Sequence, residues 1–132
     1  MASFLEMRKV LDEEKPDVVL THWPIDTTRD HSVCSLLVFD AWLRLGRKSA
    51  LYYYEVQAGE QTPSPHFRPT HYVDITAVEG RKREANFAHA SQDVASYYPL
   101  HEALHRFRGI EYRVKYAEGF ARHVQSRDET LP

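Results

Sequence analysis

Residues that can do chemistry gather in one short stretch, which reads THWPIDTTRDHSVC over residues 21–34. Asp26, Asp30 and His31 lie there between a short apolar segment and an apolar helical pattern. A neutral imidazole can bind Zn²⁺, and a nearby carboxylate can orient it. Asp26 or Asp30 could equally be the cap of a helix, with His31 merely exposed. Spacing alone leaves both a metal site and a capped helix open.

A second chemical pattern is HEALH, residues 101–105, which matches His-Glu-x-x-His on a predicted helix. His101 and His105 would face the same way to bind zinc, and Glu102 would be the general base of a metalloprotease. The continuation of the sequence does not support a metzincin, because Arg108 and Glu111 stand where that class has a glycine and a third histidine. A metalloprotease is therefore the weaker alternative.

Hydrophobic spacing predicts the elements that must position these residues. The first half of the chain is expected to form a helix over residues 3–14, a buried strand over 17–22, a helix over 32–45 and a strand over 51–56. A loop is expected over residues 57–69, where glycine and proline recur. The stretch that contains Asp26 and His31 would then follow the C-terminal end of a strand, which is a common location for an active site in an α/β fold.

The second half of the chain has a less regular pattern. It predicts a strand over residues 71–75, a helix that runs to about Ala90, a helix over 99–108 that ends at Gly109, and a last strand over 112–116. Thr76 is expected to cap the first of these helices, with Glu79 completing a capping box. The order predicts one α/β domain over residues 1–125 with a largely parallel sheet, followed by a polar tail over 126–132.

The composition is that of an ordinary globular protein. Hydrophobic residues make up 42% of the 132 positions, charged residues 27%, and the formal net charge is −2. This balance does not favour binding to nucleic acid or to an anionic membrane. No apolar run approaches the ~20 residues that span a bilayer, and the acidic start does not resemble a secretory signal. We therefore expect a cytoplasmic protein without a membrane span.

Several segments resemble the LmbE/PIG-L family of zinc-dependent de-N-acetylases. The run PDVVLTHWPIDTTRDHSVCSLLVFDAW, residues 16–42, is similar to the strand and the His-x-Asp-His box of the family's second motif. Four later segments follow in the family's order: HFRPTHYVDIT at 66–76, Lys82 with AHASQ at 88–92, RG at 108–109 and YAEGF at 116–120. The resemblance covers residues 16–121, which is most of the chain.

The resemblance implies a Rossmann-like three-layer fold and hydrolysis of an N-acetyl amide on a glucosamine-type sugar or a related compound. In such an enzyme Zn²⁺ polarises the amide carbonyl and activates water. By motif match His31 is a zinc ligand, and Asp30 and Asp26 are neighbouring carboxylates that support it. The loop that carries His66 and Arg68 is expected to contact the substrate.

Two departures from the family pattern limit the activity that we expect. Thr28 occupies the position of the first histidine of the box, which stabilises the oxyanion in the family, and loss of such a donor costs about 10²–10³ in rate. The family's His-Pro-Asp-Asp-Glu motif, which supplies two further zinc ligands and the general base, does not occur in the sequence. We expect the C-terminal portion of a deacetylase fold with missing N-terminal strands, weak or no activity, and doubtful zinc binding by this chain alone.

A sheet that lacks a central strand would also expose an edge, and such an edge can pair with another chain. The alternative to an enzyme is accordingly a non-catalytic remnant that binds a partner, a sugar or a second copy of itself.

Overall fold

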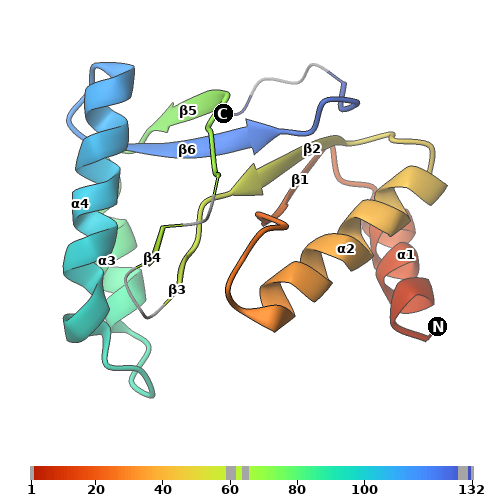
Figure 1. Cartoon of the computed structure of the whole chain (residues 1–132), viewed down its shortest axis with the longest axis horizontal. Coiled ribbons are helices and arrows are strands. Elements are labelled where there is room, and N and C mark those ends of the chain that lie inside the picture. Colours follow the sequence, from red (N-terminus) through yellow and green to blue (C-terminus); the bar gives the residue numbers. More distant parts are fainter. Residues whose placement is uncertain (1, 59–61, 64–65, 128–130, 132) are drawn as a thin grey trace.

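A computed structural model describes residues 2–58, 62–63, 66–127 and 131. Figure 1 shows the elements in chain order. The helices are α1 (Ala2–Glu14), α2 (Arg29–Arg44), α3 (Glu79–Phe87) and α4 (Val94–Tyr112), and the strands are β1 (Val18–His22), β2 (Ala50–Tyr54), β3 (Gln57–Ala58), β4 (Thr62–Pro63), β5 (His71–Asp74) and β6 (Ala117–Arg122).

The main sheet has the strand order β1-β2-β6-β5. β1 and β2 are parallel, with Val18 opposite Ala50, whereas β6 runs antiparallel to both β2 and β5. The short β3 and β4 strands form a separate hairpin inside the segment that was predicted as a loop. The α/β class is confirmed, but the main sheet is mixed and not largely parallel as expected, because only β1 and β2 pair in parallel.

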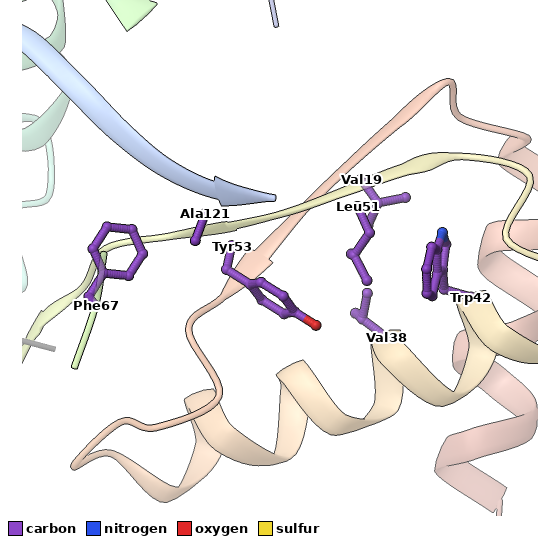
Figure 2. Packing of buried hydrophobic residues seen from close by; sticks show 7 residues of the cluster. All are labelled: Val19, Val38, Trp42, Leu51, Tyr53, Phe67 and Ala121. Atoms are coloured by element: carbon purple, nitrogen blue, oxygen red, sulfur yellow. The ribbon is translucent and has the colours of Figure 1, made fainter. Parts of the chain in front are cut away.

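One face of the sheet packs against α1 and α2 and holds the larger core (Figure 2). Side chains alternate along a strand, so every second residue of β1, β2 and β6 points to this face. Trp42 of α2 is 2% exposed and Leu51 of β2 is fully buried, and the Trp42 indole donates to Ser49 O at 2.9 Å. The core members are Val19, Val38, Trp42, Leu51, Tyr53, Phe67 and Ala121.

Helices α3 and α4 lie together at the end of the sheet toward which β2 points (Figure 1). The carboxyl ends of the parallel strands and the start of β6 therefore face α4, which packs on β6 and β5. The side chains of Tyr54 and Phe120 project from the face of the sheet opposite α1 and α2. Leu20 of β1 is on the same face and remains 48% exposed.

The second half of the chain corrects three predictions. α3 begins after Val78 without a side-chain cap, because the Thr76 hydroxyl bonds to the backbone of Tyr116, so the predicted capping box is wrong. α4 does not stop at Gly109 but continues to Tyr112, and the last strand lies at 117–122 rather than 112–116. Arg113 ends α4 in the left-handed region, with φ 63°.

None of the described helices is long and apolar enough to cross a membrane.

Candidate functional site

Asp26 and His31 form a hydrogen-bonded pair in the turn between β1 and α2. The His31 Nδ1 atom lies 3.0 Å from Asp26 Oδ2, and the other carboxylate oxygen accepts the Thr28 backbone N–H at 2.7 Å. The Asp26 side chain is 2% exposed and that of His31 is 29% exposed. Because Nδ1 faces the carboxylate, the Nε2 atom of His31 is the ring nitrogen that remains to bind a metal or a proton.

This geometry fixes the charge on Asp26. Burial acts to raise the pKa of its carboxyl, but the hydrogen bonds from Thr28 and His31 outweigh burial, and the net pKa is lowered. The lowered pKa favours the carboxylate form, which holds the His31 ring in one orientation. This arrangement is the usual support for a metal-binding histidine.

His22, at the end of β1, joins the pair through ring contacts. Its ring stacks on His31, with centroids 4.3 Å apart and 16° between the planes, and it touches the Tyr54 ring at 4.8 Å. Burial, and then the proximity of His31, lower the pKa of His22. His22 Nδ1 is buried and has no hydrogen-bond partner among the described residues. Stacked, nearly parallel imidazoles cannot point their in-plane lone pairs at one ion.

Asp30 and Thr28, which were predicted beside His31, occupy different positions. Asp30 lies in the first turn of α2 with an exposed side chain, whereas Asp26 and not Asp30 contacts the imidazole. Thr28 is the N-cap residue of α2, but its hydroxyl makes no capping hydrogen bond. The turn therefore brings together Asp26, Thr28 and His31 and leaves Asp30 at the surface.

The predicted substrate contacts His66 and Arg68 lie between β4 and β5. Both are exposed, and His66 has a positive φ of 59°. Arg68 lines a mainly apolar cavity of about 700 Å³ on the α2 side of the sheet, together with residues such as Trp23 and Leu36. Ser32, which follows His31, lines the same cavity, and none of the described hydrogen bonds joins His66 or Arg68 to Asp26 or His31.

HEALH does not have the geometry of a zinc site. The Lys82 ammonium nitrogen lies 2.9 Å from His105 Nε2, which is the atom that a metal would need, and Glu102 pairs with Arg106 at 2.6 Å. Burial, and then Lys82, lower the pKa of His105 to about 4, so the ring is neutral and accepts a hydrogen bond from the ammonium. The metalloprotease alternative has no support in this arrangement.

Sequence reasoning missed two ion-pair groups beside α4. Arg108 donates through Nε and Nη2 to both oxygens of Glu55 at 2.8–2.9 Å, and it donates through Nη1 to Glu111 at 2.7 Å. Lys82 bridges Glu118 and His105. The position of Glu55, directly after a buried strand, was the one available sign.

The described residues supply one oriented metal ligand and not a set. No group of three His, Cys, Asp or Glu side chains among them could hold a metal ion. A catalytic zinc normally takes three protein ligands. His31 and Asp26 fit one ligand and its support, but they do not by themselves fit a zinc centre.

Comparison with known proteins gives the fold. No family model and no curated protein matches the sequence. Among solved structures, GalB, the 4-carboxy-2-hydroxymuconate hydratase of Pseudomonas putida, matches 99% of this chain with a TM-score of 0.77 and 22% identity. The conserved protein TT1542 from Thermus thermophilus matches 96% at 0.74 and 22%. The N,N'-diacetylchitobiose deacetylase from Pyrococcus horikoshii matches 91% at 0.72 and 22%.

The chain spans 62%, 63% and 50% of the lengths of these three chains. It has their fold. The segments that resemble the LmbE/PIG-L family therefore lie on a fold that occurs in a hydratase as well as in a deacetylase.

Proposed function

We propose that this chain is part of a hydrolase that removes the acetyl group from an N-acetylated sugar or a related small amide. The observation that carries the proposal is the contact between Asp26 and His31. A buried carboxylate orients a partly exposed imidazole at the carboxyl end of a parallel strand pair, which is where ligands bind in open α/β sheets. The fold match to a chitobiose deacetylase adds support for an amide substrate on a sugar.

In the proposed site His31 Nε2 would be one ligand of a zinc ion, and the ion when bound would polarise the amide carbonyl. Asp26 would hold the ring with Nδ1 protonated, so that Nε2 presents its lone pair. Thr28 could donate one hydrogen bond to a developing oxyanion. Because His31 is a single ligand, we propose that the 132-residue chain alone binds zinc weakly and has little or no deacetylase activity.

The experiment is a zinc titration observed through the ring nitrogens of the eight histidines by NMR. We expect the Nε2 resonance of His31 to respond first, and we expect Asp26→Asn to weaken the response by about 10–100-fold. A response confined to His101 and His105 would refute the assignment and revive the metalloprotease. Rapid hydrolysis of N,N'-diacetylchitobiose by the isolated chain, lost in His31→Ala, would refute the proposal that the chain alone is weakly active.

A second candidate function is pairing with another polypeptide through β1. Within the described residues β1 pairs only with β2, and Leu20 is 48% exposed beside that free edge. Strands with one unpaired edge can accept a further strand, whether from a second copy or from another protein. Light scattering after size exclusion tests this candidate: a monomer at high concentration would count against self-pairing.

A further inference from the structure

A pocket of about 380 Å³ lies between α4 and the face of the sheet opposite α1 and α2. Its floor is apolar and comes from Leu20, Tyr54 and Phe120 of three different strands. Its walls carry charged and polar groups, which are Glu55, Lys82, Asn86, His101, His105, Arg108 and Glu118. It adjoins the Asp26–His31 pair, because Tyr54 lines the pocket and its ring also touches His22.

Lys82 makes two polar contacts within this pocket. Its ammonium donates to Glu118 and to His105 Nε2, and an ammonium has three donors in all. The side chains of Lys82 and Glu118 are 33% and 30% exposed, so both reach the space of the pocket. His105, only 4% exposed, acts as a fixed acceptor behind them. One N–H of Lys82 and the second oxygen of Glu118 have no hydrogen-bond partner among the described residues, so they are available to a ligand.

The charges of the lining balance. The two cations Lys82 and Arg108 face the two carboxylates Glu118 and Glu55. His101 adds no charge near neutral pH, because burial and then Lys82 lower its pKa. A pocket of this kind does not select a simple anion or cation. It offers adjacent donors and acceptors over an apolar floor.

We infer that this pocket binds the hydroxyl groups of a neutral, polyhydroxylated ligand such as a sugar ring. A hydroxyl both donates and accepts, so one hydroxyl can accept from Lys82 while it or its neighbour donates to Glu118. The rings of Tyr54 and Phe120 give an apolar surface for the C–H face of the ring. This inference rests on the proposed function in one respect: the pocket would bind the sugar whose amide is hydrolysed beside Asp26 and His31.

The test compares N-acetylglucosamine with N-cyclohexylacetamide, which has the same ring size and amide but no hydroxyls. Both are titrated into the full chain while backbone amide resonances are recorded. N-acetylglucosamine should shift resonances around Lys82, His101 and Glu118, and N-cyclohexylacetamide should bind at least about tenfold more weakly. Equal binding of the two probes, or shifts confined to the Arg68 cavity, would overturn the inference.

Single substitutions test which residues bind N-acetylglucosamine. Lys82→Met should weaken binding of N-acetylglucosamine about tenfold or more, whereas Lys9→Met, which removes an exposed lysine from a pair with Glu13, should leave it unchanged. Should Lys82→Met fail to fold, His101→Leu is the second variant, and it should weaken binding several-fold. Unchanged binding in a folded variant of either residue overturns the inference.

His31→Ala separates this inference from the proposed function. If the pocket recognises the hydroxyls, this variant keeps the affinity for N-acetylglucosamine but loses the zinc response. Loss of sugar binding in His31→Ala with retention in Lys82→Met would overturn the pocket and leave the proposed function in place. A missing zinc response with intact, Lys82-dependent sugar binding would refute the proposed function and support the pocket.

Discussion

Replacing Arg108 by methionine is expected to destabilise the fold by about 3–5 kcal/mol, because it leaves a buried carboxylate without its cation. Arg108 and Glu55 are 9% and 6% exposed, and three hydrogen bonds of 2.8–2.9 Å join them. Domains of this size have about 5–15 kcal/mol of stability in total. The loss would be a large fraction of it.

The two partners of this pair should not be equivalent. Glu55→Gln leaves Arg108 bonded to Glu111 at 2.7 Å. We therefore expect a smaller loss than for Arg108→Met, which removes the one cation that contacts Glu55 among the described residues. The control is Arg106→Met on the same helix. It breaks a pair of similar length with Glu102, but Arg106 is 62% exposed, and the change in stability should be small.

Urea denaturation followed by circular dichroism measures these differences. A pH series adds a second criterion, because burial already raises the pKa of Glu55 in the native protein and removal of Arg108 should raise it further. A carboxyl whose folded pKa is raised stabilises the fold at low pH and loses that contribution as pH rises. The deficit of Arg108→Met should therefore shrink on acidification. A deficit as small as that of Arg106→Met would refute the view that this pair acts as a buried unit.

Three further outcomes are expected. The buried His105 has a pKa of about 4 against the usual 6.5. The native protein should therefore lose about 3 kcal/mol of unfolding free energy as pH falls from 6.5 to 4. Urea titrations should show a smaller loss of stability in acid for His105→Gln. Asp26, with its lowered pKa, stabilises the fold above the ordinary titration range of an aspartate and loses this effect in acid. Asp26→Asn should lower the unfolding free energy by about 1–3 kcal/mol at neutral pH, and its stability should fall less steeply with acidification in the same assay. Gly109→Ala should destabilise the fold by about 1–3 kcal/mol, because the added Cβ would lie 2.7 Å from the carbonyl oxygens of residues 114 and 115. Gly80 has open space around it, so Gly80→Ala should stabilise α3 by up to about 1 kcal/mol. Thermal unfolding of both variants measures these changes.

The first half of the fold could be predicted from sequence because its elements have clear periods and clear stops. The predicted strand at 17–22 and helix at 32–45 match β1 and α2 within a few residues. α4 was harder to predict, because it contains Pro99 and its C-cap is Arg113, a residue type that does not signal the end of a helix. Gly109 has the residue type of a helix stop, but the helix continues past it. It is instead a helical position where the backbone of residues 114 and 115 approaches too closely for any side chain.

The candidate site was likewise predictable only in part from the sequence. Asp26 and His31 are five positions apart in one turn, and their spacing alone left open whether a carboxylate there orients the imidazole or caps a helix. The carboxylate that actually meets the imidazole is Asp26, because Asp30 enters the helix and turns outward. Lys82 and Glu118 are 36 positions apart, and Glu55 and Arg108 are 53 apart, and only the packing of α4 on the sheet brings them together. No local pattern carries that information.

The strand order has a consequence for synthesis of the protein. β6 lies between β2 and β5, although it is made 43 residues after β5 ends, from Asp74 to Ala117. At about 5–20 residues per second, β5 spends roughly 2–9 s after its synthesis with no strand to pair with. During that interval its hydrogen-bonding groups and those on the β6 side of β2 are open to other chains. The ribosome-bound protein should therefore need a chaperone most between the emergence of β5 and that of β6.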